Sequence, residues 1–79
     1  MKTVTAHSSK PGHQFQLLEQ IFLDACDDPD KWVFVPKAGS GDMFYSCRQN
    51  IETGDTITCQ GNADESHTFT LTQETYAQP

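Results

Sequence analysis

Apolar residues at helical spacing follow the first proline of the chain. Ser9 and then Pro11 are typical of the start of a helix. Asp28 precedes Pro29, which biases Asp28 away from helical geometry, so the helix should end there. The pattern predicts a helix over residues 11–27 with one apolar stripe that contains Phe15, Leu18, Ile21, Phe22, Ala25 and Cys26.

The period of the apolar residues changes to two after this helix. Residues 31–37 contain a run that is apolar on both faces, formed by Trp32, Val33, Phe34 and Val35. Proline cannot donate to a strand ladder, so Pro36 places the end of this strand at a sheet edge or a turn.

Three more segments have the pattern of strands. Residues 43–49 alternate between two sets of side chains, and residues 67–73 alternate cleanly with Phe69 and Leu71 on the inward face. Residues 2–6 contain two threonines and a valine, which favour an N-terminal edge strand.

A glycine turn predicts how the two middle strands pair. Gly54 fits the left-handed position of a three-residue connection, which would pair Ile51 with Asp55. In that register Cys47 lies opposite Cys59. The face under the helix would then contain Met43, Tyr45, Cys47, Ile57 and Cys59.

These elements predict an α+β fold in which one N-terminal α-helix packs on a three- to four-stranded antiparallel meander, with residues 2–6 as an extra edge strand. We expect one small acidic domain over residues 1–79, with flexible ends at 1–9 and 74–79. A domain of this size buries only about 60% of the surface of its unfolded chain, so the core must be thin.

Charge narrows the classes of partner. Eleven acidic residues against five basic ones give a net charge of −6. The basic residues are scattered along the chain: Lys2, Lys10, Lys31, Lys37 and Arg48. Phosphate binding depends on clustered lysine and arginine, so direct binding of nucleic acid is disfavoured and a basic partner surface is favoured.

No segment approaches the roughly 20 consecutive apolar residues that span a bilayer, so we expect no membrane partner. Three cysteines without a framework spacing suit a reducing compartment, and we expect a cytoplasmic protein. No nucleophile signature or phosphate-binding loop is present, so we expect neither catalysis nor a cofactor.

The cysteines allow an alternative from another class. Cys47, Cys59 and His67 would converge on one face of the predicted hairpin, which would give a small metal or redox site. Their spacing lacks the close ligand pair of structural zinc sites. A Cys47–Cys59 disulfide is compatible with the predicted pairing. Cys26 is expected in the core, so an enzyme that uses Cys26 as its nucleophile is a weaker hypothesis.

The acidic group at the predicted end of the helix is the most unusual local feature. Asp24, Asp27, Asp28 and Asp30 stand where the helix dipole already carries partial negative charge. They are either a solvated helix end or a recognition site for a basic partner. Trp32 beside them is either a core residue or a binding anchor of that site.

The sequence thus favours a non-catalytic binding module or inhibitor that uses its acidic surface to occupy a basic or nucleic-acid-binding site on a larger protein. In size and charge it resembles the small inhibitors that phages and mobile elements encode against host enzymes or defence complexes. A nucleic-acid mimic would need the aspartates near residue 28 and the acidic loop residues Glu52, Asp55, Asp64 and Glu65 on one continuous surface.

Overall fold

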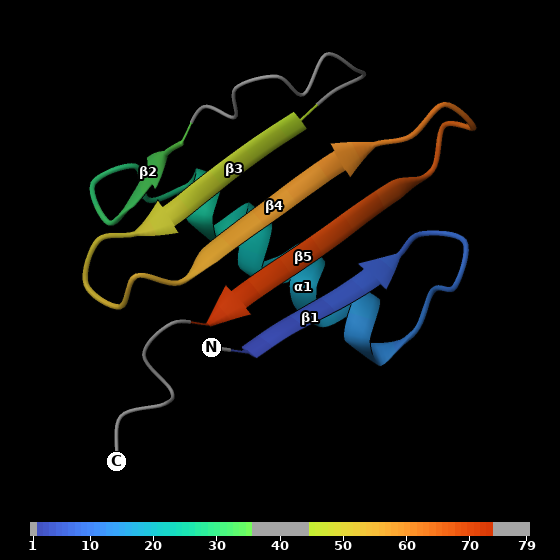
Figure 1. The fold of residues 1–79 in the computed structure, drawn as a ribbon, viewed down its shortest axis with the longest axis horizontal. Helices are drawn as coiled ribbons and strands as arrows, with labels where there is room; N and C mark the ends of the chain where they lie inside the picture. Colours follow the sequence, from blue (N-terminus) through green and yellow to red (C-terminus); the bar gives the residue numbers. More distant parts are fainter. Residues whose placement is uncertain (1, 36–44, 74–79) are drawn as a thin grey trace.

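One helix and a five-stranded antiparallel sheet form the structure, a computed structural model that describes residues 2–35 and 45–73 (Figure 1). The elements in chain order are β1 (Lys2–His7), α1 (His13–Cys26), β2 (Trp32–Phe34), β3 (Tyr45–Asn50), β4 (Thr56–Gly61) and β5 (His67–Gln73). The strand order is β1-β5-β4-β3-β2. The predicted α+β class and the N-terminal edge strand are confirmed.

The core lies between α1 and one face of the sheet, and α1 crosses that face diagonally (Figure 1). Its centre is Phe69 on β5, whose ring centroid lies 5.4 Å from that of Phe15 and 5.6 Å from that of Phe22. The buried members of this core are Leu18, Ala25, Ile57, Cys59, Phe69 and Leu71. The predicted apolar stripe therefore faces the sheet, apart from its last residue.

The ends of α1 differ from the prediction. The N-cap is Gly12, because Ser9 forms a turn with His7 instead: the Ser9 amide donates to His7 Nδ1 at 3.1 Å. At the other end Cys26 is exposed, so its predicted place in the core is wrong. Ala25, which is fully buried, is the last residue of the helix that lies in the core.

The register between β3 and β4 is shifted by one residue from the predicted one. Asn50, not Ile51, closes the turn: the Asn50 amide donates to the Asp55 carbonyl at 2.8 Å. The Asn50 side chain also accepts hydrogen bonds from the amides of Glu52 and Thr53, at 2.8 and 3.0 Å. Gly54 has the predicted positive φ, 82°. The turn chemistry around Asn50 thus lengthens the connection by one residue.

This shift reverses the faces of β3, because neighbouring residues of a strand point to opposite sides. Cys47 pairs with Thr58, and Ser46 pairs with Cys59, so the two cysteines lie on opposite faces of the sheet. The predicted Cys47–Cys59 opposition is wrong. Met43 and the side chain of Tyr45 lie outside the described part of the chain.

β2 forms one edge of the sheet, which is one of the two places, an edge or a turn, that Pro36 predicted, and β1 forms the other edge. β2 is only 3 residues long and pairs with β3 through Trp32↔Asn50, Val33↔Gln49 and Phe34↔Arg48. In the described residues, no helix combines the length and the apolar character needed to cross a membrane.

Candidate functional site

Two turns that are far apart in the sequence meet at one end of the molecule. The turn after α1 joins the β3–β4 turn through a hydrogen bond of 2.9 Å from the Ile51 amide to the Lys31 carbonyl. Beside it, Lys31 Nζ lies 3.6 Å from Glu52 Oε1. Glu52 therefore joins the aspartates that precede Lys31.

We call this region the acidic end and define it by its exposed carboxylates: Asp24, Asp27, Asp28, Asp30 and Glu52. The last turn of α1 carries no basic residue, so nothing within it offsets the partial negative charge of the helix C-terminus. Gln20 makes a local contact, donating from Nε2 to Asp24 Oδ1 at 2.9 Å. The predicted aspartates are thus gathered at one end, and Glu52 is an addition that the sequence did not place there.

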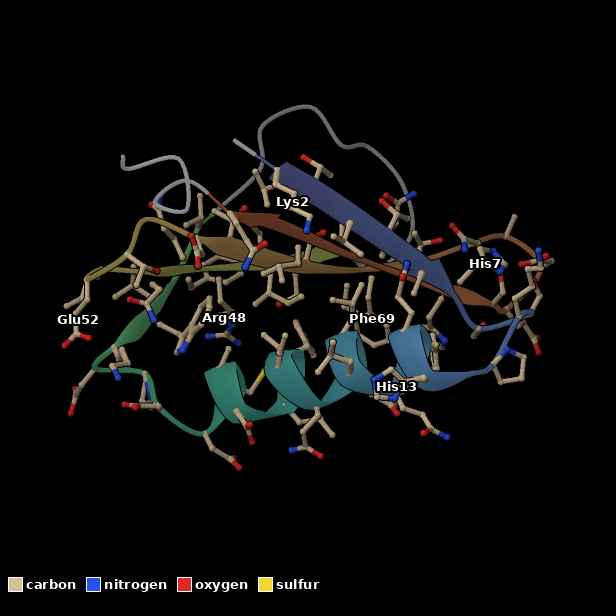
Figure 2. The ribbon with its side chains drawn as sticks, turned by 90° about the horizontal axis from the view of Figure 1, so that it is seen from below. Lys2, His7, His13, Arg48, Glu52 and Phe69 are labelled. Carbon is tan, nitrogen blue, oxygen red and sulfur yellow. The ribbon has the colours of Figure 1, made fainter. Side chains whose placement is uncertain are left out.

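The other acidic loop residues do not join this region. Asp64 and Glu65 lie in the β4–β5 turn, at the opposite end of β4 from Glu52. Figure 2 shows Glu52 and His7, which contacts the β4–β5 turn, at opposite ends of the molecule. Asp55 shares the turn of Glu52 and is half-buried. The eight acidic residues therefore do not form one continuous surface.

The predicted anchor Trp32 is half-buried and packs against the core. Three other apolar side chains are more open: Val33, Phe34 and Ile51 are 38%, 56% and 63% exposed. The sequence analysis described residues 32–35 as apolar on both faces and did not predict this exposed group. The adjacent Pro36 was the signal for an edge strand.

Arg48 lies under the helix as a result of the register shift. Its guanidinium carbon sits 5.4 Å from the centre of the Phe34 ring. Its buried Nε has no hydrogen-bond partner among the described residues. Figure 2 shows the Arg48 side chain between the sheet and the last turns of α1, where a positive charge is favourable.

A second polar group, the His7 cluster, lies at the opposite end and consists of His7, Ser9, Asn62, Asp64, Ser66 and Thr68. His7 Nε2 is 3.1 Å from Ser66 Oγ, and Ser66 Oγ donates to Asp64 Oδ1 at 2.5 Å. Asn62 Nδ2 donates to Ser66 Oγ and to Thr68 Oγ1, at 3.0 and 3.1 Å. This cluster ties the β1–α1 connection to the β4–β5 turn.

The Ser66 hydroxyl of this cluster donates to a carboxylate, Asp64 Oδ1, at 2.5 Å. On the imidazole ring, His7 Nδ1 accepts from the Ser9 amide at 3.1 Å, and His7 Nε2 lies 3.1 Å from Ser66 Oγ and 3.4 Å from Asn62 Nδ2. The hydrogen bonds from the Ser66 hydroxyl and amide hold the pKa of Asp64 below its usual range. The cluster acts as a structural clasp.

An open pocket of about 610 Å³ lies between β1 and the start of α1. Its lining runs from Thr5 to His7 and from Lys10 to Phe15, and it includes no carboxylate and none of the predicted site residues. Gln14 crosses this region and donates from Nε2 to the Thr5 carbonyl at 2.8 Å.

The cysteines do not form the alternative site. Cys47 is on the outer face of the sheet and Cys59 on the helix face, so they and His67 do not converge as the predicted register suggested. Within residues 2–35 and 45–73 no three His, Cys, Asp or Glu side chains are placed to share a metal ion. Burial, helped by the nearby Cys26 and Glu19, raises the pKa of Cys59 and keeps it a thiol.

Comparisons with protein-family models, with curated proteins and with solved structures find no match to this chain.

Proposed function

We propose that this protein is a non-catalytic binding domain whose acidic end recognises a basic surface of a larger protein. The observation that carries the proposal is the meeting of two segments: the turn after α1 and the β3–β4 turn bring Asp28, Asp30 and Glu52 to one end. A partner surface rich in lysine and arginine is complementary to this arrangement.

Apolar side chains near these carboxylates add to the argument. Ile51 is 63% exposed and stands next to Glu52, and Leu23 is half exposed beside Asp24 in the last turn of α1. Protein interfaces combine an apolar centre with a polar rim. Carboxylates alone increase the association rate and orient the partner more than they increase the affinity. The acidic end offers both kinds of group.

The position of the charges supports a role outside folding. Carboxylates at a helix C-terminus oppose the helix dipole, at about 0.3–1 kcal/mol each. Asp24 and Asp27 stand there without a basic residue in the same turn of α1. Residues that cost stability are expected where they serve function.

The experiment compares two charge-matched variants in affinity capture from lysate of the native host. One variant carries Asp28→Asn and Asp30→Asn at the acidic end, and the control carries Asp64→Asn and Glu65→Gln at the opposite end. Both lose two negative charges, so net charge cannot account for a difference between them. Captured proteins are identified by mass spectrometry at low and moderate salt.

A basic protein that is retained by the wild type and by the control, but lost by the variant of the acidic end, supports the proposal. The retention should also weaken with salt, because exposed charges are screened within about 10 Å at 0.1 M ionic strength. Equal retention by both variants would overturn the assignment of the site to the acidic end.

A further inference from the structure

The outer edge of β2 presents backbone groups that have no partner within the part of the chain that the structure describes. The Lys31 carbonyl accepts from Ile51 and the Val35 amide donates to the Cys47 carbonyl, at 2.9 and 2.8 Å. Peptide groups alternate in direction along an antiparallel strand, so Trp32 and Phe34 direct theirs away from β3. The Trp32 amide already donates to the Asp28 carbonyl, at 2.9 Å. The Trp32 carbonyl and the amide and carbonyl of Phe34 have no backbone partner among residues 2–35 and 45–73, so another strand can pair with them.

The side chains of this edge are apolar and exposed on both faces of the sheet. Phe34 is 56% exposed on the helix side, and Val33 is 38% exposed on the outer side. Arg48 covers one face of the Phe34 ring and leaves the rest open. Charged side chains normally protect a sheet edge, and the three residues of β2 carry none.

The opposite edge of the sheet differs in its exposed side chains. The peptide groups of Thr3 and Thr5 on β1 point outward. The Thr5 carbonyl already accepts a hydrogen bond from Gln14 Nε2, at 2.8 Å. The exposed side chains of β1, Lys2, Thr3 and Thr5, are polar, and Lys2 would repel a basic segment. The two edges are therefore not equivalent, and β2 is the one open to a basic strand.

We infer that the edge of β2 binds an extended segment of a basic protein as an added β-strand, with its lysine or arginine side chains at Asp28, Asp30 and Glu52. Backbone hydrogen bonds to the edge and an apolar side chain on Phe34 would supply the remaining contacts. The Arg48 charge directs the basic side chains away from the Phe34 ring and toward the aspartates. The inference rests on the proposed function and specifies its partner.

The first test uses wild-type protein and two synthetic probes. One is a peptide of alternating lysine and valine. The other is the same peptide with N-methyl groups on alternate residues, which removes the backbone N–H donors along one edge of the peptide and leaves its charge unchanged. Binding is followed by the fluorescence of Trp32, the only tryptophan of the chain. The first peptide should bind at low salt, and the methylated peptide should bind about five- to tenfold more weakly, as expected for one or two lost hydrogen bonds.

The second test changes the edge itself. Phe34→Pro removes the outward amide and leaves the ladder to β3 intact, because the Phe34 amide is not part of that ladder. Phe34→Ala is the matched control, since it removes the ring and keeps the amide. Binding should be weaker for Phe34→Pro than for Phe34→Ala.

The outcomes separate this inference from the proposed function. Equal binding of the two peptides, no binding of either, or equal binding by the proline and alanine variants would overturn strand addition at β2. Each of these results leaves the proposed function standing if the variant of the acidic end still loses its basic partner while the charge-matched control retains it.

Discussion

Asn50 decides, as a single residue, which side chains of β3 face the core. Its carbonyl accepts from Gly54 and its side-chain oxygen accepts from Glu52 and Thr53, so the turn is complete without Ile51. Asn50 itself is 7% exposed, and little water is available to replace these contacts. An asparagine at the start of a turn thus overrides the pairing that the glycine alone predicts.

Replacing Asn50 with alanine should destabilise the protein. The variant leaves the amides of Glu52 and Thr53 without their acceptor, and we expect a loss of about 1–3 kcal/mol in the free energy of unfolding. Chemical denaturation measures it. Asn50→Asp keeps an acceptor oxygen and should lose less. An alanine variant as stable as the wild type would show that the side chain does not hold the turn.

Asp64 should make the stability depend on pH. Hydrogen bonds from Ser66 lower the pKa of Asp64 in the folded protein, so its contribution is present at neutral pH and is lost as the pH falls through that lowered pKa. Asp64→Asn should therefore flatten the decline of the melting temperature below about pH 4. Asp30→Asn removes a carboxylate at the other end and serves as the control. The same dependence of melting temperature on pH in the wild type and in Asp64→Asn would show that Asp64 does not stabilise the fold through the His7 cluster.

At the scale of elements, α1 stabilises the fold through one face only. Leu18 is 1% exposed against the sheet, and its neighbour Leu17 is 51% exposed. The helix contacts β1, β3, β4 and β5. Its length of 14 residues is marginal for an isolated helix, so its stability must come from this packing.

Adjacent leucines test this directly. Leu18→Ala should lower the free energy of unfolding by about 2–5 kcal/mol, because it leaves a cavity in the core. Leu17→Ala should change it by less than about 0.5 kcal/mol, because that side chain is on the surface. Thermal and chemical unfolding measure both. Similar losses in the two variants would mean that the helix is rotated from its assigned face.

At the scale of the whole molecule, charge is distributed unevenly. The net charge is −6, and five exposed carboxylates of the acidic end, Asp24, Asp27, Asp28, Asp30 and Glu52, lie around the meeting of two turns. The opposite end holds the His7 cluster, whose polar groups bind one another. Such a separation is expected to orient the molecule on a basic surface before contact.

Neutralising one carboxylate should therefore have opposite effects on stability and on binding. Asp27 caps the C-terminus of α1, and Asp27→Asn should raise the free energy of unfolding by about 0.3–1 kcal/mol while weakening capture of a basic partner. Denaturation and capture assays are run on the same preparation. A variant that loses stability, or that binds as tightly as the wild type, would contradict this role of the acidic end.

The sequence by itself determined the elements and the fold class. Helical spacing after Pro11 specified α1, and alternation specified β5 at residues 67–73. The proline after Val35 indicated an edge or a turn, and β2 is an edge strand. These features follow from local physics, since the burial of one stripe and the geometry of proline act within a few residues.

Only the tertiary structure decided what the elements bring together. The Asn50 turn set the register, and a shift of one residue exchanged Cys47 for Ser46 and Arg48 on the core face. The contact between Lys31 and Ile51 brought Glu52 to the aspartates. The first depends on hydrogen bonds of one side chain within a turn, and the second on a contact between segments distant in the sequence. Periodicity encodes neither, because it records only which face of its own element a residue occupies.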